Sequence, residues 1–66
     1  MVYDRVKELA DKAGIPIYAL EHDAGLKNGT IGKWRTSIPT VKNLRAVADV
    51  LGVTLNDITD GLSFKD

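Results

Sequence analysis

The sequence has no cysteine and only one histidine, so the side chains that most often build metal and redox sites are nearly missing. The absence of cysteine excludes disulfides and thiolate metal sites and favours a reducing compartment, so we expect a cytoplasmic protein. His22 has no second histidine, cysteine or spaced carboxylate cluster to join it, and we interpret it as an ordinary exposed helix residue. No nucleophile–base pair or phosphate-binding loop can be assembled, so we expect no enzyme activity, metal, cofactor or small-molecule ligand.

Long hydrophobic runs are also missing. No apolar stretch reaches the length of a signal or membrane-spanning helix, so we expect no membrane partner. The 66 residues allow one domain, which we expect to span 1–66, and a hydrophobic content of 44% suffices for one small core. A chain of this size buries only about 60% of its unfolded surface, so we expect marginal stability unless packing is good or the chain oligomerises.

An excess of positive charge is the third absence, because the formal net charge is zero. This argues against nucleic-acid binding, since domains with that function are usually basic. The charges are unevenly spread, however: residues 1–23, 24–48 and 49–66 carry −2, +5 and −3. The middle block contains no acidic residue, and its cations are Lys27, Lys33, Arg35, Lys42 and Arg45. Such a block favours an anionic partner, although a small domain can also have one by chance.

Hydrophobic spacing predicts helices along nearly the whole chain. The expected segments are 2–13, about 15–24, about 27 or 28 to 35, 40–51 and 54–61. Gly14, Gly25, Gly52 and Gly61 are the expected helix ends. Thr40 is the expected N-cap of the fourth helix, whose buried stripe is Val41, Leu44, Val47, Ala48 and Leu51. Thr54 and Asp57 have the spacing of a capping box at the start of the fifth.

The chain is organised around residues 20–34. Leu20 and Ala24 share one helix face, Gly25 suits a left-handed helix end, and Ile31 and Trp34 have the spacing of an inward stripe on a second short helix. This pattern predicts a helix-turn-helix over about 17–35. The polar face left free carries Lys27, Asn28, Thr30, Lys33 and Arg35.

Together with Ser-Ile-Pro-Thr at 37–40 and Leu-Gly-Val-Thr-Leu-Asn-Asp-Ile at 51–58, this stretch resembles the XRE-type helix-turn-helix domain of the lambda-repressor and Cro superfamily. The resemblance covers about residues 2–60. It implies a compact, all-α fold of five helices with a C-terminal tail at 61–66. It also implies a sequence-specific double-stranded DNA-binding regulator of a phage or mobile element, either a Cro-like minimal regulator or the N-terminal part of a larger repressor. Such a protein would bind a near-palindromic operator as a homodimer.

Glu21 and Lys27 stand where the family often has alanine and a capping serine. We expect Glu21 to face outward. Either Asn28 caps the third helix or Lys27 serves to contact a phosphate or a base. Gly29 and Gly32 allow two equal interpretations, which are deep entry of the backbone into a DNA groove and close packing against the second helix.

The expected sites follow from the free face and the resemblance. Base-reading candidates are Lys27, Asn28, Gly29, Thr30 and Lys33. Candidates for phosphate contacts are Arg35, Thr36, Ser37, Thr40, Lys42 and Asn43. The apolar tail either folds back or forms a dimer seam, and the dimer-contact candidates are Ile58, Leu62 and Phe64. The rival interpretation is a protein-interaction module, such as an antitoxin or anti-repressor, that acts mainly through another protein.

Overall fold

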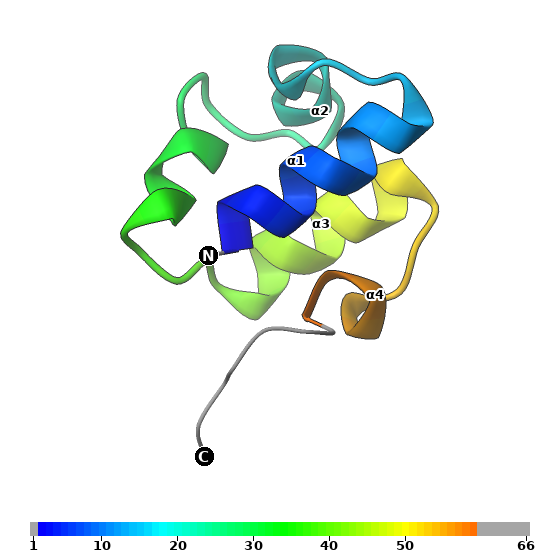
Figure 1. Cartoon of the computed structure of the whole chain (residues 1–66). Coiled ribbons are helices and arrows are strands. Elements are labelled where there is room, and N and C mark those ends of the chain that lie inside the picture. The colour runs from blue at the N-terminus through cyan, green and yellow to red at the C-terminus, as the bar shows by residue number, and fades with distance from the viewer. Residues whose placement is uncertain (1, 60–66) are drawn as a thin grey trace.

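The computed structural model describes residues 2–59, most of which lie in helices and none of which lies in a strand (Figure 1). The elements are the α-helices α1 (Val2–Ala13), α2 (Ile17–Asp23), α3 (Val41–Leu51) and α4 (Leu55–Thr59), and the 3-10 helix η1 (Ile31–Arg35). The all-helical prediction is therefore confirmed, whereas the prediction of five α-helices is not. The third segment is a 3-10 helix that begins at Ile31, because Gly29 at φ +87° interrupts any helix that would start earlier.

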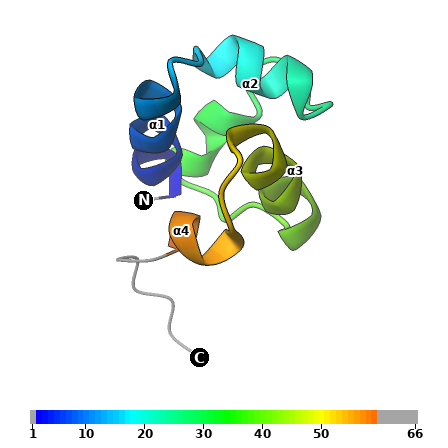
Figure 2. The ribbon, with the colours of Figure 1, turned by 90° about the vertical axis from the view of Figure 1, so that its right-hand side faces the viewer.

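The helix α1 is the hub of the arrangement, because it contacts each of the other four elements. In both views α2 lies at the top and α4 at the bottom, with α1 and α3 between them (Figures 1 and 2). Each element supplies one large side chain that is completely buried, and together these form the centre of the core. They are Val6, Leu20, Ile31, Val47 and Ile58. Since every element contributes to one shared core, no helix is stabilised by its own sequence alone.

Local capping signals are confirmed where they were predicted. The Thr40 hydroxyl oxygen accepts a hydrogen bond of 3.2 Å from the Asn43 N–H and so caps α3. Thr54 and Asp57 form the reciprocal capping box: the Thr54 N–H donates to Asp57 Oδ2 at 2.9 Å, and the Asp57 N–H donates to Thr54 Oγ1 at 3.1 Å. Gly52 ends α3 in the left-handed conformation at φ +72°. The predicted end at Gly61 lies outside the described residues.

The prediction that Val41 begins the buried stripe of α3 is wrong. Its side chain is 64% exposed, and the buried positions of this helix are Leu44, Val47 and Ala48. Side chains of a helix lean toward its N-terminus, so the side chain of the first residue of α3 leans past the end of the helix and away from the core.

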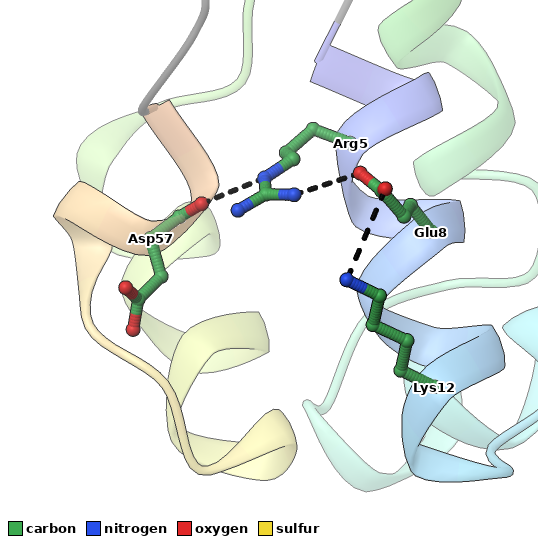
Figure 3. Close-up of polar contacts among 4 residues, drawn as sticks. All are labelled: Arg5, Glu8, Lys12 and Asp57. Carbon is green, nitrogen blue, oxygen red and sulfur yellow. Dashed lines mark hydrogen bonds and ion pairs between the residues drawn. The ribbon is translucent and has the colours of Figure 1, made fainter.

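A polar link joins the N-terminal helix to the last described one (Figure 3). Arg5 Nε donates to the Asp57 carbonyl oxygen at 2.8 Å, and Arg5 Nη1 donates to Glu8 Oε1 at 2.7 Å. Glu8 Oε2 also lies 4.0 Å from Lys12 Nζ. The hydrogen bond from Arg5, helped by the charges of Arg5 and Lys12, lowers the pKa of Glu8. Because a five-residue helix leaves most of its carbonyls without an intrahelical partner, Arg5 satisfies a group that α4 cannot satisfy itself.

Among residues 2–59, no helix combines the length and the apolar character needed to cross a membrane.

Candidate nucleic-acid interface

The chain turns sharply after α2, and the turn is closed by backbone hydrogen bonds. Gly25 adopts φ +75°, and its N–H donates to the His22 carbonyl at 3.1 Å. The Leu26 N–H donates to the Glu21 carbonyl at 2.8 Å, and the half-buried Leu26 side chain packs against the core. Gly25 therefore occupies a conformation that a residue with a Cβ atom adopts only with strain. The next residues, 27–30, lead directly into η1.

Glu21 is buried, with only 3% of its surface exposed, so the prediction that it faces outward is wrong. Its two carboxylate oxygens hold the backbone ahead of η1. Oε1 accepts the Gly29 N–H at 3.1 Å, and Oε2 accepts the Ile31 N–H at 2.9 Å. These bonds satisfy N–H groups that the start of a helix leaves without intrahelical partners, and they satisfy the buried carboxylate as well.

The same two hydrogen bonds show that Glu21 caps the third helical segment. Thr30 is the N-cap residue, but no side-chain oxygen near it in sequence provides the cap. Of the two alternatives, the one in which Asn28 caps this segment is therefore wrong, because the cap comes from Glu21, ten residues before Ile31. The other alternative, a phosphate or base contact by Lys27, stays a prediction. Two features of the sequence could have indicated this cap. Glu21 is an acidic residue at a position where the neighbouring helix approaches, and Lys27, which cannot cap a helix, stands at the expected cap position.

Ile31 and Trp34 point into the core, as their spacing predicted, with exposed fractions of 0% and 4%. The opposite side of the segment is left to the solvent. Lys27, Asn28, Gly29 and Lys33 are exposed and Thr30 is half-buried. The five predicted base-reading residues thus lie on the turn before η1 and on its outer side, where none of them is needed to fill the core.

Gly29 and Gly32 do not pack closely against α2. A Cβ atom at Gly29 would meet no atom within 4 Å, and one at Gly32 would meet only Arg35 Nη1, at 3.9 Å. The packing interpretation is therefore wrong for both. Gly29 is required by its positive φ, whereas nothing within residues 2–59 requires a glycine at Gly32.

The cations of the acid-free block are exposed, and most have no partner in the part of the chain that the structure describes. Neither an ion pair nor a side-chain hydrogen bond engages Lys27, Lys33, Lys42 or Arg45 there. The cations of α1 differ, because all three are paired with acidic residues of the same helix. Those pairs are Arg5–Glu8, Lys7–Asp11 and Lys12–Glu8. The unpaired positive charge of the described chain is thus concentrated on η1, the turn before it and the first turns of α3.

Arg35 is held differently from the other four cations. Its guanidinium lies over the ring of Tyr3 on α1, with Cζ 4.1 Å from the ring centroid. A guanidinium stacked on a ring keeps its N–H edge available, so this contact fixes where Arg35 can meet an anion without consuming its donors.

The loop between η1 and α3 holds most of the other predicted phosphate contacts. The Thr36 and Ser37 N–H groups both donate to the Lys33 carbonyl, at 3.2 Å and 3.0 Å, while both side chains remain exposed. Thr40 is exposed and Asn43 is half-buried at the start of α3. In Figure 1, η1 and this loop lie together along the left edge of the view, so the candidates form one continuous part of the chain on one side of the molecule.

Two exposed apolar side chains in this region were not predicted as surface features. Ile38 in the loop is 77% exposed and Val41 at the start of α3 is 64% exposed. Ile38 lies between Ser37 and Pro39 in a loop, where sequence periodicity gives no information on burial.

The predicted dimer contacts are not brought together. Ile58 is completely buried in the core of its own chain, which leaves its side chain no surface to offer a second chain. Leu62 and Phe64 lie outside the described residues. His22 is exposed, and its Nδ1 lies 3.4 Å from Asp23 Oδ1. No group of three potential metal ligands occurs among residues 2–59.

Neither protein-family models nor curated proteins gave a match to the sequence.

Proposed function

We propose that this protein binds duplex DNA sequence-specifically and regulates transcription by occupying its site, as an XRE-type helix-turn-helix regulator does. In this proposal α2, the turn at Gly25 and η1 act as the helix-turn-helix. One observation carries it: the surface formed by η1, the turn before it and the start of α3 bears four exposed cations without partners in residues 2–59. Neutralising phosphates with such lysines and arginines is the main source of affinity in DNA-binding proteins.

Base reading is assigned to the exposed turn and to the outer side of η1. The Asn28 amide suits bidentate hydrogen bonding to adenine, and the Lys33 ammonium suits guanine O6 and N7. Thr30 is placed between them to meet a thymine methyl or a phosphate. Gly29 and Lys27 complete the reading surface, since the open space beside Gly29 allows a base edge to approach the backbone.

Phosphate contacts are assigned to the residues that flank the reading surface. Arg35 and the hydroxyls of Thr36 and Ser37 lie on one side of it along the chain, and Lys42 lies at the start of α3. The N-terminus of a helix favours an anion, so the beginning of α3 suits a phosphate. Such contacts set the register of the protein on the duplex and carry no sequence information themselves. Thr40 and Asn43 complete this set.

We further propose that two copies bind a near-palindromic operator, with reading segments about 34 Å apart on successive turns of the duplex. Occupancy then excludes polymerase or another regulator from the same DNA. The test is selection from a pool of random duplexes at two salt concentrations. The expected result is a palindromic motif whose affinity falls steeply with salt. Weak binding without a motif at either concentration would contradict the proposal.

A second candidate function is a protein-interaction module. The exposure of Ile38 and Val41 favours it, because two large apolar side chains among cations suit a protein partner. The Ile38→Ser, Val41→Ser double variant separates the two functions. If the chain acts through DNA, the variant keeps the selected motif. If selection yields no motif for the wild type and the variant loses capture of a protein partner, the second function replaces the first.

A further inference from the structure

We infer that Glu21 is a positioning residue for base reading: from behind the reading surface, its buried carboxylate sets the backbone of the turn that presents Asn28 and Thr30. This inference rests on the proposed function. Glu21 itself does not reach DNA in this arrangement, since only 3% of its surface is exposed.

The carboxylate is placed to control the turn because its two oxygens bind on either side of Thr30. One holds the Gly29 N–H at 3.1 Å and the other holds the Ile31 N–H at 2.9 Å. Thr30 is thereby fixed between two anchored peptide groups, and Asn28 directly precedes the first of them. The backbone of Thr30 makes two further bonds: its N–H donates to the Lys27 carbonyl at 3.1 Å, and its carbonyl accepts the Lys33 N–H at 3.2 Å.

The turn needs such an anchor because it contains a glycine in the left-handed region. Glycine has more conformational freedom than any other residue type, and Gly29, at φ +87°, has no side chain to restrict its backbone. No side-chain cap is contributed by Thr30 either. Glu21 is therefore the side chain that selects one conformation of this segment from those accessible to it.

The charge of Glu21 also lies where it does least harm to DNA binding. Its carboxylate is hydrogen-bonded to the backbone of the acid-free block, and both oxygens are turned inward onto N–H donors. A carboxylate on the outer side of η1 would instead repel phosphates. The Glu21 carboxylate thus orders the backbone beneath a cationic surface while the carboxylate itself stays buried.

Loss of this anchor should affect sequence discrimination more than affinity for DNA in general. Lysine–phosphate contacts tolerate small displacements, whereas bidentate contacts to base edges require a fixed geometry. The informative variant is Glu21→Gln, which keeps the shape of the side chain and replaces one acceptor oxygen by an NH2 donor facing an N–H. Glu8→Gln is the matched control, because it makes the same chemical change at an exposed carboxylate of α1, whose partners Arg5 and Lys12 lie on the same helix.

The experiment measures, for folded protein, the ratio of Kd for the wild-type operator to that for the same duplex with one base pair changed, and the Kd for a random duplex. We expect Glu21→Gln to lose about tenfold in discrimination, comparable to losing one good base contact, while its Kd for random duplex stays within about twofold. Glu8→Gln should keep both values. Glu21→Asp, whose shorter side chain cannot hold both N–H groups at once, should fall in between and replaces Glu21→Gln if that variant does not fold.

A second measurement keeps the inference distinct from the proposed function. Amide NMR shifts and hydrogen exchange of Gly29 and Ile31 should change in Glu21→Gln and stay unchanged in Glu8→Gln. If those amides change and the wild type discriminates, but Glu21→Gln discriminates equally well, the positioning role is overturned while the proposed function stands. If the wild type itself shows no discrimination, the proposed function fails, and the role in base reading fails with it. If the amides of Glu21→Gln are unchanged, the anchor itself is disproved.

Discussion

Arg35 Cζ lies 4.1 Å above the ring centroid of Tyr3, and this contact joins the end of η1 to the first turn of α1. The two residues are far apart in the chain, and each restricts or covers the side chain of the other. The ring restricts the guanidinium to one place on the surface, and the guanidinium covers a half-buried aromatic face. Under the proposed function, the ring would present Arg35 to a phosphate in a prearranged position, which would lower the entropic cost of the contact.

Replacing Tyr3 by leucine should remove this stacking while it preserves apolar volume. We expect a loss of about 0.5–1 kcal/mol in unfolding free energy, as for an exposed cation–π contact. Urea denaturation of Tyr3→Leu, Arg35→Ala and the double variant measures the coupling directly. If the two single effects simply add, the stacking contributes nothing to stability.

Truncation of the base-reading side chains should weaken specific binding without unfolding the protein. Asn28→Ala and Lys33→Ala are each expected to cost about 1–3 kcal/mol on the selected operator. Both side chains are exposed, so the thermal transition should stay where it is in the wild type. Lys12→Ala on α1 is the matched control for the loss of one positive charge away from the proposed surface. Wild-type affinity in both test variants would mean that the reading surface is assigned to the wrong residues.

Removal of the Lys42 side chain should act differently from removal of Asn28. Loss of a phosphate contact should weaken binding about equally on all sequences and should reduce the slope of log K against log salt by about 1. Binding to operator and random duplex across a salt series measures both effects in Lys42→Ala. A loss confined to the operator would instead place Lys42 among the base-reading residues.

Gly32→Ala separates what the fold requires from what DNA binding requires. A Cβ atom there meets only the flexible end of Arg35, so we expect stability to be unchanged or to rise by up to about 1 kcal/mol. Affinity for the operator should fall if the backbone at this position approaches DNA closely. Denaturation and binding are measured on the same preparation. Unchanged affinity would show that a side chain fits there in the complex, and would leave Gly32 without a role in DNA binding.

The pKa of Glu8 should report the link between α1 and α4. Its hydrogen bond with Arg5 is the largest cause of a pKa below the ordinary 4.5, so Arg5→Leu should move it up toward that value. A carboxylate whose pKa is lowered by folding stabilises the fold above its ordinary pKa, and this contribution is lost as the pH falls through the lowered value. Carboxyl NMR titration of Glu8 in the wild type and in Arg5→Leu measures the shift, and Lys12→Ala should give a smaller one. An unchanged titration in Arg5→Leu would mean that Arg5 does not hold Glu8.

Features that depend on neighbours in sequence were predictable. Ile31 and Trp34 repeat at a helical interval, so their inward orientation follows from backbone geometry alone. The cap at Thr40 and the capping box of Thr54 and Asp57 were predictable for the same reason, because donor and acceptor are three residues apart. The acid-free block of charge is likewise a property of the chain itself.

What the sequence by itself determined is thus the set of helical segments, most of their ends, and the polar face of residues 27–33. Only the tertiary structure decided the contacts that join them. Glu21 became a buried cap because the fold brings it to N–H groups eight and ten residues away. Arg35 meets Tyr3 and Arg5 meets Asp57 across even longer separations. Periodicity indicates which residues share a face of one helix. A buried charge, however, is stable only where hydrogen-bond partners surround it, and those partners come close only when the helices have packed.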